Sequence, residues 1–197
     1  MNHFRALQQS MYHRVAVGPF EAPTHALVGS DIVLHLPVLE YYASLCRHVT
    51  EFGTREGCST VALLAGCKGE VHSYDIEVTP AKAVLEAIEL PARWHFHVGD
   101  TGSPDTPVAE TDFLFVDTLH TYDHVTKELA HHGRKATKYL AFHDTFTCGE
   151  FDLSGPDPRA RGILPAIEEF LARHPGEYET AYRTSCNNGL WVLKRVA

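Results

Sequence analysis

The sequence contains no long apolar segment and no cluster of basic residues. None of its hydrophobic runs approaches the ~20 residues that a membrane-spanning helix needs. Lys and Arg number 17 against 25 Asp and Glu, which gives a formal net charge of −8. An acidic chain without a Lys/Arg-rich run is a poor match for nucleic acid or an anionic membrane surface. We therefore expect neither a nucleic-acid partner nor a membrane partner.

Cysteine is scarce, and paired cysteine motifs are absent. The five cysteines are odd in number, and none stands in a Cys-x-x-Cys pair. The N-terminus shows no signal-peptide pattern, so we expect reduced thiols and a cytoplasmic location. Internal repeats, linkers and low-complexity tracts are also absent. The length of 197 residues predicts a single domain, residues 1–197, with a substantial core.

From residue 48 onwards, strand-like and helix-like segments alternate. Strands are expected at 48–53, 69–75, 94–98, 112–117, 138–143, 178–184 and 189–195. Helices are expected at about 58–66, 80–89, 121–135 and 162–173. This pattern predicts an α/β fold with a doubly wound, Rossmann-like, seven-stranded sheet that is mostly parallel. Only residues 185–188 separate the last two strands, which predicts an antiparallel C-terminal hairpin.

Residues 1–47 form a helical N-terminal preface to the Rossmann-like core at 48–197. Phe4, Leu7 and Met11 share one helical face, which indicates a short amphipathic helix over residues 2–12. Ser30-Asp31 offers a cap for a second helix, with Pro37 in its first turn. Its expected inward residues are Leu39, Tyr42, Leu45 and Cys46. We expect the preface to lie across the sheet edge or over the substrate, and to offer a surface for a homo-oligomer.

The segment Glu51–Ser59 is a glycine turn between the first strand and the next helix. The helix N-terminus leaves N–H groups free, which favours a negative group on a ligand. Glu51 would repel a pyrophosphate but suits an ammonium group, and bulky Arg55 departs from the dinucleotide glycine pattern. S-Adenosylmethionine carries both an ammonium group and a carboxylate. The expected cofactor contacts here are Glu51, Gly53, Thr54, Arg55, Gly57 and Ser59; a plain tight turn is the alternative.

Acidic residues also follow the second and third strands. Asp75 ends the second strand, where a carboxylate can accept hydrogen bonds from both ribose hydroxyls. Asp100 and Thr101 follow the third strand and are placed to contact the adenine edge. Each aspartate taken alone could instead cap a helix or hold a turn. Together with the glycine turn they mark three successive strand ends that converge on one crevice, which favours a cofactor site.

Two more aspartates end the fourth and fifth strands. Asp117 and Asp144 would repel each other at neighbouring strand ends unless a cation lies between them. Such a pair suits Mg²⁺ or another divalent ion that polarises a substrate hydroxyl. His120, three residues beyond Asp117, could reach that hydroxyl as a general base. Alternatively, Asp117 caps the next helix, Asp144 holds a backbone turn and His120 is an ordinary loop histidine.

Four other histidines and one long loop carry weaker signals. His131 and His132 occupy adjacent helical positions that face different ways, so we expect a solvated surface there. His95 and His97 share a face of the edge strand and are expected to be structural. The loop 145–161 is rich in Gly, Pro and Asp and is a candidate lid, with Glu150 and Arg159 as polar contacts.

The chain resembles class I S-adenosylmethionine-dependent methyltransferases. More narrowly, it resembles the branch that contains cephalosporin hydroxylase-type proteins and the sugar O-methyltransferases of macrolide and rhamnosyl pathways. The matching stretches are Ser30-Asp-Ile, His35-Leu-Pro, Glu51-Phe-Gly-Thr-Arg, Phe115-Val-Asp117, His120-Thr-Tyr122, His143-Asp-Thr145 and Asn187-Asn-Gly-Leu190. A sheet of parallel strands with a C-terminal hairpin is the usual architecture of this fold.

The resemblance implies that Asp117 and Asp144 are metal ligands and that His120 is the base. Asp117 would also contact the cofactor. Metal-dependent members usually have Glu where this chain has His143, and an imidazole ligand would favour a softer ion such as Mn²⁺, Fe²⁺ or Zn²⁺. We expect methyl transfer to a hydroxyl of a small polar acceptor, a sugar or natural product. The alternatives are an NAD-dependent oxidoreductase and a non-catalytic cofactor-binding protein on the same fold.

Overall fold

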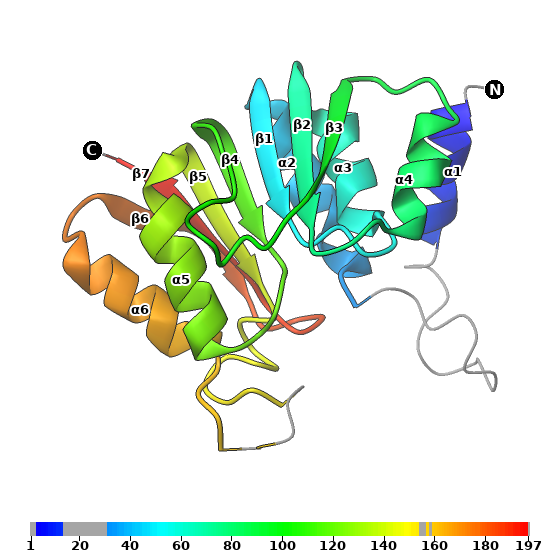
Figure 1. Cartoon of the computed structure of the whole chain (residues 1–197). Helices are drawn as coiled ribbons and strands as arrows, with labels where there is room; N and C mark the ends of the chain where they lie inside the picture. The colour runs from blue at the N-terminus through cyan, green and yellow to red at the C-terminus, as the bar shows by residue number, and fades with distance from the viewer. Residues whose placement is uncertain (1–2, 14–30, 154–156, 158, 197) are drawn as a thin grey trace.

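The computed structural model describes residues 3–13, 31–153, 157 and 159–196. They form a seven-stranded sheet between two layers of helices (Figure 1). The strands are β1 (His48–Phe52), β2 (Glu70–Asp75), β3 (Arg93–Val98), β4 (Thr111–Val116), β5 (Ala136–His143), β6 (Tyr178–Thr184) and β7 (Leu190–Arg195). Their spatial order is β3-β2-β1-β4-β5-β7-β6. The first five strands are parallel, whereas β7 runs antiparallel to β5 and β6, so the predicted sheet and hairpin are confirmed.

The helices divide into two layers that follow the two halves of the chain. One face is covered by α1 (His3–His13), the 3-10 turn η1 (Val33–His35), α2 (Leu36–Ser44), α3 (Cys58–Gly66) and α4 (Pro80–Glu86). The other face is covered by α5 (Tyr122–His132), the 3-10 turn η2 (Gly133–Lys135) and α6 (Ile163–Arg173). In Figure 1, α5 and α6 lie on the β4–β7 half of the sheet. The expected helices are therefore present, and α4 is shorter than its pattern suggested.

The central strands are apolar along their whole length because both of their faces are covered. In β4, Phe113 and Phe115 pack against the α1–α4 layer, and Leu114 and Val116 pack against the α5–α6 layer. All four side chains are buried. Continuous apolar strands are typical of buried parallel sheets. This packing fixes the ends of β1, β4 and β5 side by side, which places the residues that follow them at one edge of the sheet.

Two predictions for the preface are wrong in detail. Helix α2 begins at Leu36 after a 3-10 turn, so Asp31 does not cap it; Ser30 lies outside the described residues. Pro37 does occupy the first helical turn, as expected. Leu45 is 43% exposed because the helix ends at Ser44 and Leu45 no longer follows its periodicity. The expected inward packing of Leu39, Tyr42 and Cys46 is confirmed.

His132 also departs from expectation. It is 1% exposed, and its ring packs against Phe52 of β1, with the ring centroids 5.5 Å apart. The predicted solvated position is therefore wrong for His132 and correct for His131, which is exposed. His132 is the last residue of α5, and its ring covers the side chain of Phe52.

One crossover connection in the fold contains no helix. Residues 99–110, which join β3 to β4 and are all described, form turns and extended segments. This connection passes the C-terminal end of β2, where the Tyr74 hydroxyl donates a hydrogen bond to the Pro107 carbonyl at 2.7 Å. Apart from the contact between His132 of α5 and Phe52, no described helix covers the β1–β3 half of the sheet on the α5–α6 face (Figure 1).

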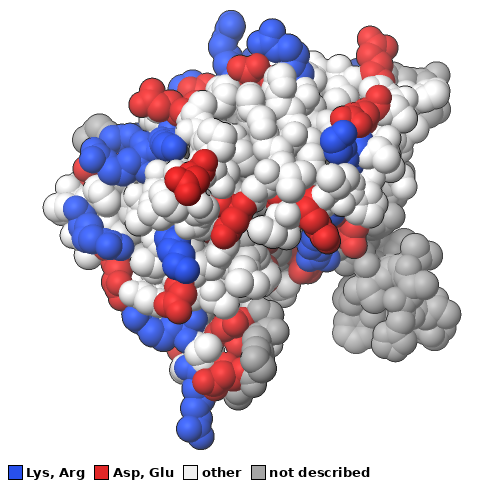
Figure 2. Space-filling view, viewed as in Figure 1, with Lys and Arg blue, Asp and Glu red and all other residues white. Residues whose placement is uncertain are grey.

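The surface charge and the helix lengths agree with what the amino-acid composition led us to expect. In the view of Figure 2, basic and acidic side chains are interspersed across the described part of the visible face. No helix among the described residues has the length and apolar character needed to span a bilayer. The five cysteines are free thiols, and only Cys186 is exposed.

Candidate active site

The Glu51–Ser59 turn is shaped by close approaches within the protein. Gly53 has a φ of +88°, and a Cβ there would lie 2.0 Å from the Asp117 carbonyl oxygen. Gly57 has a φ of +78°, and its Cβ would lie 2.8 Å from the Ala81 Cβ. Both positions therefore require glycine, on conformational and on steric grounds. The turn therefore packs closely against the end of β4 and against helix α4.

Asp75 holds the backbone of the turn. Its Oδ2 atom accepts hydrogen bonds from the Thr54 N–H at 2.9 Å and from the Arg55 N–H at 3.0 Å. Arg55 has a φ of +44°, an unfavourable region for a non-glycine residue, and these bonds help to fix it there. The Arg55 side chain extends outward and forms an ion pair with Asp31 at 3.6 Å.

Glu51 anchors the start of α3 from within the core. The residue is 0% exposed, and its carboxylate accepts hydrogen bonds from Ser59 at 2.6 Å, Thr60 at 2.7 Å and Ser73 at 2.6 Å. Burial raises the pKa of Glu51 and the three hydroxyl donors partly offset this, which leaves it at about 7. The carboxylate therefore ties α3 to β1 and β2. Contact with a cofactor ammonium group would require this buried arrangement to open.

A small cavity of about 20 Å³ lies directly against the turn. Its lining residues are Asp31, Ile32, Gly53, Thr54, Arg55, Glu56, Cys58, Ser59 and Asp117. The structure thus brings Gly53, Thr54, Arg55, Ser59 and Asp117 of the predicted cofactor set to one cavity. Gly57 and Asp75 support the turn around it.

Asp100 and Thr101 have local roles in the structure. Asp100 Oδ1 accepts a hydrogen bond from the Gly102 N–H at 2.8 Å, and its side chain lines a separate surface hollow beside His97. Thr101 is 4% exposed and donates a hydrogen bond to Glu128. Neither residue lines the cavity at the turn. Their predicted contact with adenine remains a prediction.

Two aspartates and two histidines meet at the ends of β4 and β5. His143 Nδ1 lies 3.2 Å from Asp117 Oδ1 and 2.9 Å from Asp144 Oδ2. His120 Nε2 lies 2.9 Å from Asp144 Oδ2 and 3.6 Å from Asp117 Oδ1. The sequence predicted this convergence, and Asp117 links the cluster to the cavity at the turn. We call Asp117, His120, His143 and Asp144 the catalytic cluster, after the role that we propose for them below.

The charges in the catalytic cluster shift one another's pKa values. Burial raises the pKa of Asp117, but His143 and His120 outweigh it and lower this pKa to about 2. Burial lowers the pKa of His120, but hydrogen bonds and charges from Asp117 and Asp144 raise it to about 10. The pKa of His143 is likewise raised well above its ordinary value, and that of Asp144 is lowered, despite burial in both cases. Without another cation, both imidazoles are therefore protonated at neutral pH.

Two further residues position His143, and the sequence reasoning assigned them no role. The Asn187 carbonyl oxygen lies 3.1 Å from His143 Nε2 and 2.9 Å from His35 Nε2. The His35 and His143 rings meet edge to face, with centroids 5.3 Å apart. Both residues lie in stretches that carry the family resemblance. That resemblance was the only signal that could have indicated them, because their meeting depends on the terminal hairpin.

The donor atoms of the catalytic cluster fit a divalent metal ion. His120 Nε2 and His143 Nδ1 each lie 2.9 Å from Asp144 Oδ2, so two imidazole nitrogens and a carboxylate oxygen converge at one point. The ligand atoms of Asp117, His143 and Asp144 all lie within 4.8 Å of one another. A mixed imidazole and carboxylate set favours Mn²⁺, Fe²⁺ or Zn²⁺ over Mg²⁺.

A larger cavity of about 550 Å³ begins next to Asp144. It is lined by Thr145, Phe146, Thr147, Glu150, Phe151, Leu153, Leu164, Arg183, Thr184 and Ser185. Residues 145–153 thus form one wall and the end of β6 the other. Glu150 lines this cavity as expected, whereas Arg159 is not among its lining residues. Phe146 and Phe151 are 68% and 50% exposed, so aromatic surface faces the space.

Comparisons with known proteins agree with this fold. A family model described as a methyltransferase domain matches residues 50–145. At the sequence level, no curated protein gives a significant match. Among solved structures, an O-methyltransferase from Bacillus cereus in complex with SAH is similar at 15% identity and a TM-score of 0.65, covering 100% of this chain and 92% of that one.

Two other solved structures show the same likeness. The O-methyltransferase TomG from Streptomyces achromogenes, involved in tomaymycin synthesis and in complex with SAM, shares 16% identity at a TM-score of 0.64, covering 96% of this chain and 89% of that one. A putative caffeoyl-CoA O-methyltransferase from Staphylococcus aureus shares 12% identity at a TM-score of 0.61, covering 97% of this chain and 91% of that one.

The fold and the matched segment define the class of protein. The seven-stranded sheet with its antiparallel C-terminal strands is the Rossmann-like fold of the class I methyltransferases. The residues that match the methyltransferase-domain model run from β1 through the turn to the catalytic cluster. The resemblance to class I methyltransferases predicted from the sequence is confirmed.

Proposed function

We propose that this protein is a S-adenosylmethionine-dependent O-methyltransferase that acts on a hydroxyl group of a small polar acceptor. The observation that carries the proposal is the position of Asp117. This residue lines the cavity at the glycine turn and also belongs to the catalytic cluster. A methyl donor held at the turn would therefore lie beside the groups that activate the acceptor. Such positioning supplies much of the catalysis in a displacement reaction.

The chemistry of the residues that line the cavity at the turn suits the methionine end of the cofactor, although the cavity must widen to admit it. The N–H groups at the start of α3 favour its carboxylate, and the Asp117 carboxylate favours its ammonium group. Because Asp117 has a lowered pKa, it is negatively charged at neutral pH. In this proposal Asp117 contacts the ammonium group in place of the buried Glu51, while Asp75 takes the ribose hydroxyls and keeps the turn in shape.

His120 is the proposed general base. It is partly exposed, with 22% of its side-chain surface accessible, and lies 2.9 Å from Asp144. Its raised pKa means that it holds a proton at neutral pH, unless a second cation neutralises the two carboxylates. Asp117, His143 and Asp144 would hold such a divalent ion, which when bound would polarise the acceptor hydroxyl. His120 is then free to take the hydroxyl proton.

The cavity beside Asp144 is the proposed acceptor site. Its aromatic and aliphatic wall suits the flat face of a ring, and Glu150 and Arg183 offer hydrogen bonds to polar substituents. These features support a small ring compound with several hydroxyl groups, such as a sugar or a phenolic natural product. The acidic surface and the absence of a basic run support a small-molecule acceptor over nucleic acid.

The experiment supplies S-adenosylmethionine with a trideuterated methyl group and a panel of hydroxylated sugars and phenols. Mass spectrometry should detect an acceptor that gains the labelled methyl group on oxygen. Substitution His120→Ala should reduce the rate by 10²-fold or more, the usual contribution of a general base. The matched control His131→Ala changes an exposed histidine outside the cluster and should leave the rate unchanged. Equal rates in both variants would contradict the role of His120.

Metal removal gives a second test of the same site. Dialysis against a chelator should abolish turnover, and Mn²⁺ or Zn²⁺ should restore it better than Mg²⁺ because one of the three proposed ligands, His143, is an imidazole. Full turnover in the chelated enzyme would show that the cluster acts without an ion. Cofactor affinity should stay within about twofold throughout, because the turn itself supplies most of the proposed contacts.

A further inference from the structure

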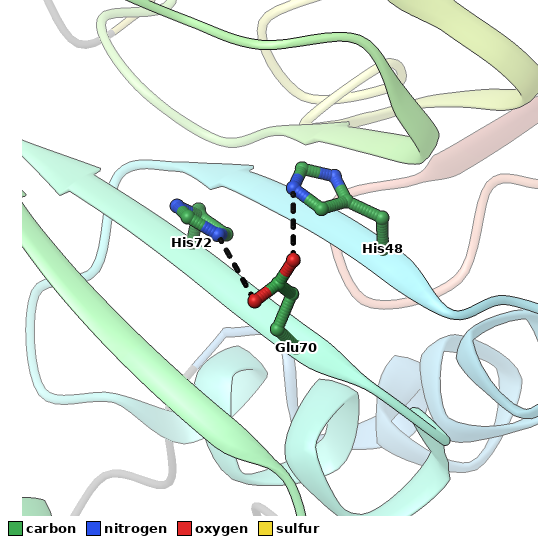
Figure 3. Close-up of side chains that lie close together, drawn as sticks. All are labelled: His48, Glu70 and His72. Atoms are coloured by element: carbon green, nitrogen blue, oxygen red, sulfur yellow. Dashed lines mark ion pairs between the residues drawn. The ribbon is translucent and has the colours of Figure 1, made fainter.

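The uncovered half of the sheet carries a cluster of histidines around one glutamate. On β1 and β2, Val49 and Val71 pack into the α1–α4 layer, so His48, Glu70 and His72 point to the opposite face. No described helix covers that face here, because the β3–β4 connection contains none. Figure 3 shows the Glu70 carboxylate between the two rings, with one oxygen facing each.

The register of the sheet brings these side chains together. His48 lies directly opposite Glu70 in the β1–β2 pair, and His72 lies opposite His95 in the β2–β3 pair. His48 Nε2 is 3.9 Å from Glu70 Oε1, and His72 Nε2 is 4.0 Å from Glu70 Oε2. The ligand atoms of His48, Glu70 and His72 all lie within 4.8 Å of one another. We call these three residues the open-face cluster.

We propose that the open-face cluster is a second metal site, which binds Zn²⁺ or a similar divalent transition ion and clamps β1 to β2. Two imidazoles and a carboxylate form a common protein ligand set for zinc. With bonds of about 2.1 Å, two tetrahedral ligands lie about 3.4 Å apart, so the two His–Glu separations need to close by about half an ångström. The two imidazoles must also approach each other from a separation of at most 4.8 Å. At 3.9–4.0 Å these pairs are too long to be hydrogen bonds.

The hydrogen bonding of His72 prepares it as a ligand. His72 Nδ1 lies 3.0 Å from His97 Nε2, and His72 Nε2 is buried without a hydrogen-bond partner. When Nδ1 donates to His97, Nε2 directs a lone pair towards the Glu70 carboxylate. Metal-ligating histidines usually donate their second N–H in this way.

The surroundings leave room for an ion and for a fourth ligand. The side chains of His48, Glu70 and His72 are 22%, 30% and 20% exposed, so an ion can enter from solvent. His95 Nε2 lies 3.5 Å from Glu70 Oε2, and its ring stacks on His72 at 4.5 Å between centroids. Arg93 also pairs with Glu70 at 3.3 Å, but its side chain is 76% exposed and can swing away. His95 or water would complete the coordination.

The open-face cluster is separate from the catalytic cluster. It lies at the start of β1 and β2, whereas the catalytic cluster follows the ends of β4 and β5. The ion would join the two strands on the face that lacks a helix, and the expected effect is structural. Binding to the native state alone raises stability by mass action, so Zn²⁺ should raise the melting temperature through this site.

The test counts bound zinc by equilibrium dialysis on tag-free protein. The double variant His48→Gln/His72→Gln should lose one equivalent of Zn²⁺ relative to wild type, and Glu70→Gln should weaken that equivalent about tenfold or more. His131→Gln is the matched control and should bind as wild type does. Asp144→Asn, in the catalytic cluster, should leave the open-face equivalent in place. This last variant separates the present proposal from a metal in the catalytic cluster.

Thermal unfolding of the same variants separates a lost zinc site from a misfolded protein. The double variant should show the same thermal shift with S-adenosylhomocysteine as wild type, which establishes that it is folded. If Glu70→Gln and the folded double variant bind as many zinc ions as wild type with equal affinity, the proposal is overturned. If the zinc-dependent rise in melting temperature is also equal in wild type and the double variant, the clamping role is overturned with it.

Discussion

At the residue scale, the site depends on a few side chains whose surroundings change their chemistry. Glu51 is the clearest case, because a carboxylate without any exposure accepts three hydroxyl hydrogen bonds instead of facing a ligand. Asp144 is another: it has a φ of +57° at the end of β5, and this strained backbone turns its carboxylate into the catalytic cluster. Strained residues of this kind concentrate at functional sites.

Glu51 predicts a specific dependence of stability on pH. Its pKa is raised from 4.5 to about 7, so its contribution is fully present below pH 4.5 and is lost as the pH rises through 7. The protein should lose about 3 kcal/mol of unfolding free energy from this residue over that range. Glu51→Gln should remove the loss, which denaturant titrations of both proteins at pH 5 and pH 8 can measure. A variant destabilised equally at both pH values would contradict this interpretation.

Gly53 should be required because a side chain there would clash with β4, and a second glycine with a positive φ separates this clash from backbone strain. Gly53 and Gly176 both have positive φ values, +88° and +78°, but a Cβ at Gly176 would meet nothing within 4 Å. Gly176→Ala should therefore cost only the backbone strain of about 1 kcal/mol. Gly53→Ala adds the clash with the Asp117 carbonyl, so it should cost several times as much and reduce cofactor affinity. Equal losses in melting temperature would show that the turn can move away from β4.

At the element scale, the ends of β1, β2 and β4 together hold the cofactor turn. Asp75 reaches from the end of β2 to two N–H groups of the turn that follows β1. The backbone at the end of β4 approaches the same turn at Gly53. The turn is therefore fixed before any ligand arrives, which lowers the entropy lost on binding.

Asp75→Ala tests the coupling between β2 and the turn. The change leaves the Thr54 and Arg55 N–H groups without their carboxylate partner and removes the proposed ribose contact. Cofactor affinity should fall tenfold or more, and the unfolding free energy should fall by about 1–3 kcal/mol. Calorimetric titration and thermal unfolding measure the two effects. Undiminished affinity would remove Asp75 from the cofactor site.

The sequence predicted elements well and contacts between distant elements poorly. All seven strands could be predicted from local sequence patterns. Apolar runs bounded by turn residues indicate burial directly. The cluster at Asp117 and Asp144 was also predictable, since parallel strand ends meet at one edge of a sheet. The open-face cluster was not, because the pairing of His48 with Glu70 depends on strand register and on a missing crossover helix. The hydroxyl cage around Glu51 likewise appears only when α3 and β2 are packed against β1.

At the scale of the whole molecule, the two halves of the sheet carry different parts of the proposed site. The β1–β3 half carries the glycine turn, and the β4–β7 half carries the catalytic cluster and the proposed acceptor cavity. Asp117 lies at their junction, because β4 pairs with β1 in the centre of the sheet. This arrangement gives the account its central claim, that S-adenosylmethionine binds at the turn while the acceptor is activated on the other side of Asp117.

A calorimetric titration of the protein with S-adenosylmethionine tests that claim most directly. Wild type and His120→Ala should bind it with affinities that agree within about threefold, because His120 acts on the acceptor and does not line the cavity at the turn. Gly53→Ala should bind far more weakly, and NAD⁺ should give no heat with any of the three. Binding of NAD⁺ in place of S-adenosylmethionine, or loss of cofactor binding in His120→Ala, would contradict the account.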